Sequence, residues 1–234
     1  MRYDTKIEKV VIGRGPRAIE FQIEVIADFN RAIDDMFAEL QARGEQDLLV
    51  DLCPYFGTVW DSARALSALL VAEPGAAIAG KSFLEIGCGL AIPSMTLLKL
   101  GARKVTATDL HPDVPEFLER NFSANNLSGH PAFFYRALDW RARSAEVLAG
   151  RPEWILASDV LYDQGQAEAV AGFLADAFAA GATRAMITDP GRPYLQDFVS
   201  ACDRFGLKST VEIFRTDPDD SRRDCFMLRL AQED

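Results

Sequence analysis

The residues best suited to bind a ligand are a carboxylate and two glycines in FLEIGCGLAIPS, residues 83–94. Gly87 and Gly89 permit a sharp turn and let a ligand lie against bare backbone. Ile92 stands where a dinucleotide fingerprint needs its third glycine, and no Gly-Lys-Ser/Thr of a P-loop follows. Glu85, two residues before the first glycine, disfavours phosphate and suits an ammonium group. The alternative is a strand-to-helix turn without a ligand.

Two more acidic residues follow strand-like stretches. Asp109 lies where a doubly wound fold places a carboxylate on ribose hydroxyls; alternatively, it caps the next helix. Asp139, in the tripeptide LDW, is placed to accept a hydrogen bond from an adenine amino group, or lies in a surface turn. Trp140 beside it stacks on a ring or fills the rim of the core. Chance accounts less easily for Glu85 and Asp109 together than for either alone.

A carboxylate and a phenol three residues apart end the strand-like stretch that contains ASDVLYD. If the strand ends near Asp159, a turn directs both Asp159 and Tyr162 into the crevice at the sheet edge. Together they make a small polar pocket that accepts hydrogen bonds from an amine. The alternative is a helix cap and a packing tyrosine.

Two more side chains are candidates for the rim of the same site. Trp60 precedes the helix of FGTVWDSARALSALL (56–70), which Thr58 or Asp61 caps, and it either covers a ligand or packs into the core. Arg192, in DPGRPY (189–194), either binds a carboxylate or backbone at the rim or is solvated. That stretch lacks the consecutive prolines of the DPPY box of base-methylating enzymes, and it follows the fifth strand rather than the fourth.

These residues need a scaffold, and the chain alternates strand-like and helix-like stretches from residue 81 onward. Apolar-rich strands that alternate with helices predict right-handed βαβ units and a mostly parallel sheet covered on both faces. The last two strands have only the turn 216–224 between them, which predicts an antiparallel C-terminal hairpin. The fold class is therefore α/β, with a doubly wound, Rossmann-like, seven-stranded sheet. The predicted strands are 82–88, 104–110, 132–138, 154–161, 183–190, 208–216 and 225–231, and the helices are 93–100, 113–126, 141–149, 165–179 and 194–205.

Residues 1–50 follow a different pattern and predict an N-terminal extension of the domain at 51–234. Two alternating stretches, 6–12 and 18–27, flank the turn signal GRGP and predict a β-hairpin. A helical pattern follows at about 30–43.

Composition excludes several classes of function. The 234 residues are 49% hydrophobic and 26% charged, which is ordinary for a globular enzyme, and no apolar run approaches the length of a membrane span. The net charge of −10 argues against nucleic acid as a partner. Four scattered cysteines and two histidines predict no metal site and a reducing compartment. Because the charged N-terminus has no apolar signal core, we expect a cytoplasmic protein.

With these motifs assembled, the chain resembles the class I S-adenosylmethionine-dependent methyltransferases. More narrowly, it is similar to the seven-strand protein-lysine methyltransferases that carry a tryptophan loop, a D/ELGCG turn and a DxxY box. The matching stretches lie within residues 56–163 and are TVWDSARAL, FLEIGCGLAIPSMTLLKLGARKVTATDL, LDW and SDVLYD. Asp61 and Ala91 depart from the family pattern, which commonly has a proline and a third glycine there.

The resemblance implies a role for each matching residue. S-adenosylmethionine is the implied cofactor, with Glu85, Gly87 and Gly89 at its methionine part and Trp60 closing over it. Asp109 then binds the ribose, and Asp139 and Trp140 lie beside the adenine. Asp159 and Tyr162 line the substrate channel as the catalytic pair.

The implied reaction is methylation of a lysine side chain in a protein substrate. A small-molecule amine as methyl acceptor and a catalytically silent cofactor-binding module remain the alternatives, because a carboxylate and a tyrosine cannot separate them. Neither a membrane nor a nucleic acid is an expected partner, and the oligomeric state is left open.

Overall fold

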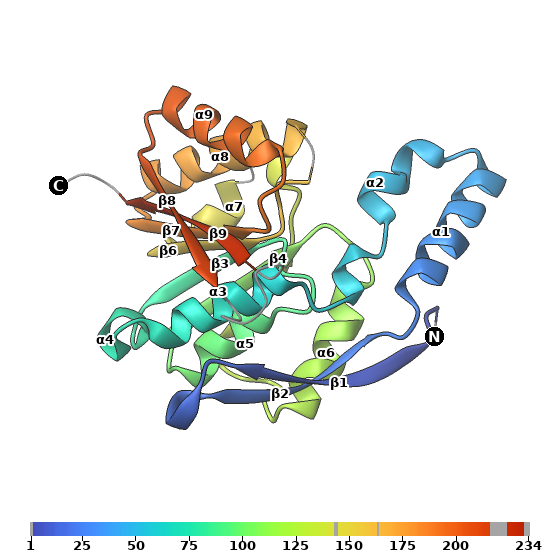
Figure 1. Ribbon diagram of the computed structural model, residues 1–234, viewed down its shortest axis with the longest axis horizontal. Helices are drawn as coiled ribbons and strands as arrows, with labels where there is room; N and C mark the ends of the chain where they lie inside the picture. Colours follow the sequence, from blue (N-terminus) through green and yellow to red (C-terminus); the bar gives the residue numbers. More distant parts are fainter. Residues whose placement is uncertain (1, 143–144, 163, 216–223, 232–234) are drawn as a thin grey trace.

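A computed structural model describes residues 2–142, 145–162, 164–215 and 224–231. Its centre is a seven-stranded sheet with helices on both faces, and the helical layers lie above and below the strands in Figure 1. The strand order is β5-β4-β3-β6-β7-β9-β8. Pairs among the first five are parallel, and β9 runs antiparallel between β7 and β8. The predicted doubly wound sheet with a reversed C-terminal pair is confirmed.

The sheet strands begin and end close to their predicted limits. Every residue of the two central strands, β3 and β6, is buried, because helices cover both faces. The predicted turn at 216–224 lies, apart from Asp224, outside the described residues. The bounds are β3 Ser82–Ile86, β4 Lys104–Asp109, β5 Phe133–Ala137, β6 Trp154–Ser158, β7 Arg184–Asp189, β8 Ser209–Arg215 and β9 Asp224–Ala231.

Two hydrophobic clusters separate the helices into layers. One holds α3, α4, α5 and α6 together with the N-terminal hairpin, and the other holds α7, α8 and α9 on the opposite face. Among the described residues, no helix is long and apolar enough to cross a bilayer. The bounds are α3 Asp61–Ala72, α4 Gly75–Ile78, α5 Ile92–Lys99, α6 Val114–Ala124, α7 Ala145–Leu148, α8 Gln164–Ala179 and α9 Tyr194–Arg204.

One predicted helix, 141–149, is wrong as a single element. The structure has a 3-10 turn, η4, at Trp140–Ala142 and the short helix α7, and residues 143–144 between them lie outside the described part. The Asp139 carboxylate accepts a hydrogen bond from the backbone N–H of Arg141 at 2.9 Å. This local bond closes a tight turn after β5, and such side-chain bonds compete with continued helix.

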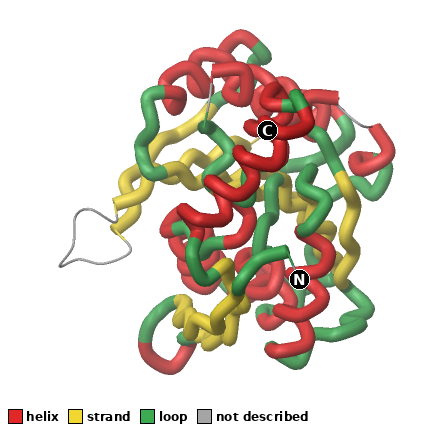
Figure 2. The backbone as a smooth tube through the Cα atoms, turned by 90° about the vertical axis from the view of Figure 1, so that its right-hand side faces the viewer, coloured by secondary structure: helices red, strands yellow, loops and turns green. Residues whose placement is uncertain are grey.

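The N-terminal hairpin is confirmed and packs on the main domain. Strands β1 (Thr5–Ile12) and β2 (Ile19–Ile26) pair antiparallel, and they lie below the main sheet in Figures 1 and 2. The side-chain amide of Asn125, the residue directly after α6, donates to the Gln22 carbonyl at 2.8 Å and accepts from the Gln22 N–H at 2.9 Å. An amide side chain thus pairs with the free edge of β2 as a neighbouring strand would.

The helix after the hairpin stands beside the carboxyl edge of the sheet (Figure 1). Helix α1, Phe29–Arg43, begins at Asp28, whose side chain accepts a hydrogen bond from the Arg31 N–H, and it ends at Gly44 in a left-handed conformation. Two short elements that the sequence pattern does not predict, η2 at Gln46–Leu48 and α2 at Leu49–Leu52, then lead back to the domain.

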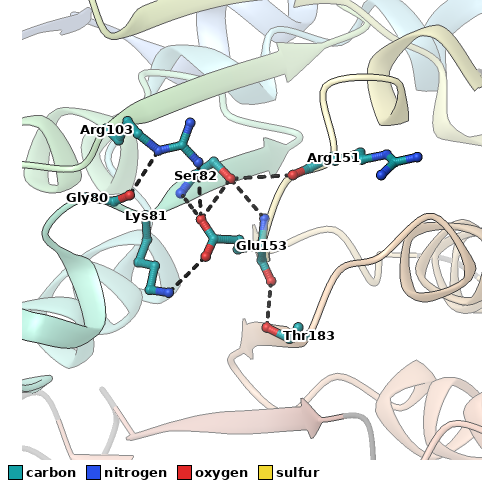
Figure 3. Close-up of polar contacts among 7 residues, drawn as sticks. All are labelled: Gly80, Lys81, Ser82, Arg103, Arg151, Glu153 and Thr183. Atoms are coloured by element: carbon teal, nitrogen blue, oxygen red, sulfur yellow. Dashed lines mark hydrogen bonds and ion pairs between the residues drawn. The ribbon is translucent and has the colours of Figure 1, made fainter.

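A polar cluster pins the amino ends of the central strands (Figure 3). Glu153, before β6, accepts hydrogen bonds from the Ser82 N–H at 3.0 Å and from Lys81 Nζ at 2.9 Å, and it pairs with Arg103 at 3.4 Å. Burial alone raises the pKa of Glu153, but the bonds from Lys81 and Ser82 outweigh it and hold that pKa below its ordinary value. This cluster lies at the opposite edge from the acidic residues that end β4 and β7.

Candidate active site

A cavity of about 480 Å³ lies at the carboxyl edge of the sheet. The ends of β3, β4 and β6 form its floor, and the segment from α2 to the start of α3 forms one side. Open α/β sheets bind ligands at this edge. Of the predicted site residues, the lining includes Trp60, Gly87, Gly89, Asp109, Asp139, Trp140, Asp159 and Tyr162.

The glycine turn between β3 and α5 needs its glycines for two reasons. Gly87 has φ +62° and Gly89 has φ +48°, values that favour glycine. A Cβ on Gly87 would lie 2.9 Å from a methyl of Val160, and one on Gly89 would lie 3.3 Å from the Phe56 carbonyl. The turn therefore presents bare backbone to the cavity.

Glu85 is placed differently from the prediction, because it does not line the cavity. Its fully buried carboxylate faces the first turn of α5, where Oε2 accepts hydrogen bonds from the Ser94 hydroxyl and, at 3.0 Å, from the Ser94 N–H. The other oxygen, Oε1, has no hydrogen-bond partner in the described structure. Burial raises the pKa of Glu85 to about 8, despite the two bonds from Ser94. Its observed contacts are with the helix start and not with the cavity.

Asp109 holds the turn from the neighbouring strand. Its Oδ2 accepts a hydrogen bond from the Gly89 N–H at 2.9 Å, and its Oδ1 accepts one from the His111 N–H at 2.9 Å. Burial raises the pKa of Asp109, and these backbone bonds oppose the rise. Each carboxylate oxygen keeps a second lone pair. The same side chain can therefore fix the turn and accept hydroxyl hydrogens from a ligand.

Trp140 and Asp139 form the wall after β5. The indole N–H of Trp140 donates to Gln166 Oε1 at 2.7 Å, and its ring lies against the glycine turn. Arg141 pairs with Asp139 at 2.8 Å and with Asp51 of α2 at 3.1 Å. The hydrogen bond from Arg141 lowers the pKa of Asp139, so this carboxylate is ionised. The bridge ties α2 to η4 across the cavity wall.

Trp60 stands at the start of α3. Its indole N–H donates to the Tyr55 carbonyl at 2.8 Å, and its ring meets Phe29 edge-on with centroids 5.8 Å apart. Neither Thr58 nor Asp61 caps α3, because neither side chain accepts a capping hydrogen bond from the N-terminal N–H groups of this helix. Trp60 is partly exposed on the cavity side, so it is held in place as a wall of the cavity.

Asp159 and Tyr162 lie on the turn after β6, which ends at Ser158, and both line the cavity. Asp159 has φ +60°, an uncommon conformation for a residue other than glycine. Burial raises the pKa of Asp159, whereas the charge of Arg192 and the Ser62 hydroxyl oppose the rise. The rings of Tyr162 and Tyr55 lie 6.4 Å apart. The turn brings the carboxylate and the phenol to one cavity, as expected.

Arg192 binds carboxylates at the rim, which was one of its two predicted interpretations. Its guanidinium forms an ion pair with Asp159 and also donates to the Asp159 backbone carbonyl at 3.3 Å. It pairs with fully buried Asp189 at 3.3 Å as well. A single arginine therefore joins the ends of β6 and β7.

Several lining residues escaped the sequence analysis. Tyr55, Asp51, Arg141 and Gln166 all face the cavity. Arg141 follows Asp139 by two residues, a spacing that allows a local ion pair, so the sequence did carry a signal for it. Gln166 is one polar residue in a largely apolar helix, and its bond to Trp140 depends on how α8 crosses the sheet.

Comparison with known proteins gives a family and a fold. The family model described as lysine methyltransferase matches residues 54–193. The electron transfer flavoprotein beta subunit lysine methyltransferase of Mus musculus is 30% identical over 140 residues, which cover 60% of this chain and 52% of that protein. The ribosomal protein L11 methyltransferase of Sorangium cellulosum is 30% identical over 118 residues, or 50% of this chain and 35% of that protein. The chain thus spans about half, or less, of the length of these relatives.

Solved structures of low identity share the fold. The magnesium protoporphyrin IX methyltransferase of Synechocystis PCC 6803 with bound SAM superposes with a TM-score of 0.58 at 14% identity, covering 89% of this chain and 99% of that one. The same enzyme with bound SAH gives a TM-score of 0.54 at 15% identity, with 81% and 87% covered. The seven-stranded sheet described above is therefore shared with these methyltransferase structures.

Proposed function

The chain belongs to the lysine methyltransferase family, and from this we propose that it methylates a lysine side chain of a protein substrate. The fold is that of the class I methyltransferases, and S-adenosylmethionine is the cofactor. The observation that carries the proposal is the placement of Asp159 and Tyr162 on the same cavity as the Gly87–Gly89 turn and Asp109. An amine acceptor and a cofactor cradle thus share one space.

The residues of the cavity fit this cofactor. Gly87 and Gly89 line the cavity with bare backbone, against which the methionine part of the cofactor can lie, and a side chain at either position would crowd the neighbouring Val160 or Phe56. Asp109 has free lone pairs for ribose hydroxyls, and the ionised Asp139 accepts a hydrogen bond beside the Trp140 wall. Glu85 takes part indirectly, because it supports the start of α5 behind the turn. Trp60 closes one side.

The chemistry asks the protein to deliver a neutral amine. When bound, S-adenosylmethionine supplies a methyl group on a sulfonium, which an amine lone pair attacks in line as the thioether leaves. A free lysine has a pKa of about 10.4, so at pH 7 its ammonium must first lose a proton. Asp159 accepts an N–H of the incoming nitrogen, Tyr162 contacts it from the same turn, and the aromatic walls exclude water.

Two features support a protein as substrate. The five relatives named as electron transfer flavoprotein beta subunit lysine methyltransferases and the ribosomal protein L11 methyltransferases all carry a protein in their names. The cavity also opens beside exposed apolar residues, Val50 at 53% and Tyr55 at 45% exposure, which suit a polypeptide surface. The electron transfer flavoprotein beta subunit is the first substrate to test.

A radiolabel assay tests this function. The purified chain is incubated with tritiated S-adenosylmethionine and either purified electron transfer flavoprotein beta subunit, ribosomal protein L11 or a cell extract separated into protein and small molecules. We expect label on lysine in a protein fraction and at least a tenfold loss in Asp159→Ala, about 1.4 kcal/mol. The control is Asp203→Ala, an exposed aspartate on α9. Label confined to small molecules, or a loss under threefold in Asp159→Ala, contradicts the proposal.

A further inference from the structure

The Asp159 carboxylate, which is the proposed acceptor for the substrate amine, already forms an ion pair with Arg192. The guanidinium pairs with the Asp159 carboxylate, and a second donor reaches the Asp159 carbonyl at 3.3 Å. This double contact clamps a residue whose φ is +60°. A lysine that reaches Asp159 therefore meets a carboxylate that already forms an ion pair with Arg192.

We propose that Arg192 is a positioning residue that keeps the bound substrate lysine neutral and sets the pH range of methyl transfer. This inference rests on the proposed function and adds that the charge of Arg192 controls the ionisation of the substrate lysine. A cation fixed beside an amine disfavours its ammonium form, and a bare carboxylate in the same place favours it. Without Arg192, the Asp159 carboxylate would stabilise the ammonium form of the lysine. With Arg192 beside it, Asp159 accepts a hydrogen bond from the neutral amine.

The guanidinium is fixed from behind by Asp189. The Oδ1 atom of Asp189 accepts hydrogen bonds from the N–H groups of Gly191 and Arg192, both at 2.8 Å, while its Oδ2 faces the guanidinium at 3.3 Å. Asp189 is fully buried, so withdrawal of the arginine would leave a buried carboxylate without its counter-charge. Displacement by an incoming lysine is therefore costly.

The loop that carries Arg192 has little freedom to move. Gly191 has φ +92°, and a Cβ there would lie 2.5 Å from the ring of Phe226 on β9. The loop thus packs tightly against the sheet at the one position where glycine is needed. The arginine therefore stays in place when the substrate enters.

The surrounding charges set the sign of the effect. With Arg192 present, one cation lies between the carboxylates of Asp159 and Asp189. Without it, the amine faces the Asp159 carboxylate, with the buried charge of Asp189 behind it and no cation beside either. The latter arrangement stabilises the ammonium and raises the pKa of the bound lysine. The other titratable groups near this cluster are Tyr162 in the same turn, Tyr55 of η3 (Tyr55–Gly57), Asp61 of α3 and Cys225 of β9.

The proton balance of the step is simple. The lysine ammonium gives its proton to water or buffer, and the lone pair so freed forms the new N–C bond while the S–C bond of the sulfonium breaks. No oxidant, reductant or metal takes part. The fraction of neutral amine at a given pH then scales the rate, which makes the pH profile the direct readout of Arg192.

The pH dependence of kcat, with saturating protein substrate and cofactor, tests the inference, because kcat reports ionisations in the bound complex. In Arg192→Gln the acid limb should move to higher pH by about one unit or more, so that kcat falls about tenfold at pH 7.5 and recovers toward pH 9.5. Arg192→Lys keeps the positive charge but not the planar guanidinium. The acid limb of its kcat profile should therefore stay at the parental pH, while kcat falls by the same factor at every pH. Arg204→Gln, an exposed arginine on α9, is the matched control.

A second measurement does not depend on turnover. Calorimetry of substrate binding to the complex with S-adenosylhomocysteine, in buffers of different ionisation enthalpy, counts the protons released. We expect the intact chain to release more protons near pH 8.5 than Arg192→Gln does. Equal release overturns the inference, as does an Arg192→Gln loss of kcat by one factor at every pH, or a lower KM with an unmoved limb. If the intact chain methylates no lysine at any pH, the proposed function fails and the inference falls with it; otherwise the two are judged separately.

Discussion

The carboxylate of Glu85 accepts a hydrogen bond from the backbone N–H of Ser94 at 3.0 Å, so an acid within β3 stabilises the first turn of α5. The N-terminus of a helix carries partial positive charge and free N–H groups, which favour such an acceptor. Full burial nevertheless raises the pKa of Glu85 to about 8, and at neutral pH the carboxyl is mostly protonated. Titration of Glu85 should therefore make the stability of the glycine turn depend on pH.

Glu85→Gln should flatten the pH dependence of stability. The folded pKa lies above the unfolded value, so Glu85 contributes stability that is full below about pH 4.5 and is lost as pH rises through about 8. The uncharged amide lacks this loss. In urea unfolding without ligand, the parent should weaken between pH 5.5 and 8.5 more than the variant does. Glu119→Gln, an exposed carboxyl on α6, should follow the parent. Parallel curves for the parent and Glu85→Gln would show that Glu85 is not the titrating group.

Glu153 should make the free energy of unfolding rise with pH in the acid range, which is the opposite of the slope expected for Glu85. Its pKa is depressed in the folded state, so its contribution is present above about pH 4.5 and is lost as pH falls through the folded value. Glu153→Gln should cost about 1 kcal/mol at pH 7, because the amide loses the ion pair with Lys81. The difference from the parent should disappear near pH 3 in chemical unfolding. Methylation at pH 7.5 should stay at the parental level, since the cluster lies at the other edge of the sheet. A constant difference at all pH values would argue against the ion pair.

Asn125 should measure how firmly the hairpin is attached. Asn125→Ala removes the side-chain partner of the Gln22 N–H and carbonyl, and because Gln22 is an exposed residue each lost hydrogen bond should cost about 0.5–1.5 kcal/mol. We expect an early loss of protection at β2 in hydrogen exchange, with smaller changes in the main sheet. Asn30→Ala, an exposed asparagine on α1, is the control. A uniform loss of protection throughout the chain would show that the hairpin and sheet unfold as one unit.

Particular residues show which parts of the fold and the site could be predicted from the sequence. The central strands β3 and β6 could be predicted because their apolar runs are buried on both faces. The strand predicted at 154–161 ends at Ser158, which fulfils the condition under which a turn at Asp159 was expected. Glu85 was predicted at the ligand from its charge and its place two residues before Gly87, whereas its contact with Ser94 depends on how α5 packs over β3, which a strand pattern does not indicate. The contact between Arg192 and Asp159 joins residues 33 apart, and it depends on the adjacency of β6 and β7. Where one helix was predicted at 141–149, local bonding at Asp139 closes a turn, and the structure has η4 and α7 instead.

Asp109 gives the most direct test of the cofactor site. Asp109→Ala removes the proposed ribose acceptor and also frees the Gly89 N–H, so both the ligand contact and the shape of the turn are lost. Each lost hydrogen bond to a charged group is worth about 1.5–3 kcal/mol, which corresponds to about a tenfold to hundredfold weaker affinity. Asp109→Asn keeps one acceptor oxygen and should fall between the parent and the alanine variant.

Calorimetric titration with S-adenosylhomocysteine measures these affinities directly, and a thermal melt without ligand reports whether each variant is folded. Asp47→Ala, an exposed aspartate of η2 outside the cavity lining, should bind as the parent does. A folded Asp109→Ala that binds S-adenosylhomocysteine with parental affinity would remove Asp109 from the cofactor site. A folded parent that gives no binding heat at several temperatures would argue against the cofactor itself. Because Asp109 touches the turn and not the Asp159–Arg192 pair, its loss should weaken cofactor binding without moving the acid limb of kcat measured at saturating cofactor, which separates cofactor binding from control of the lysine charge.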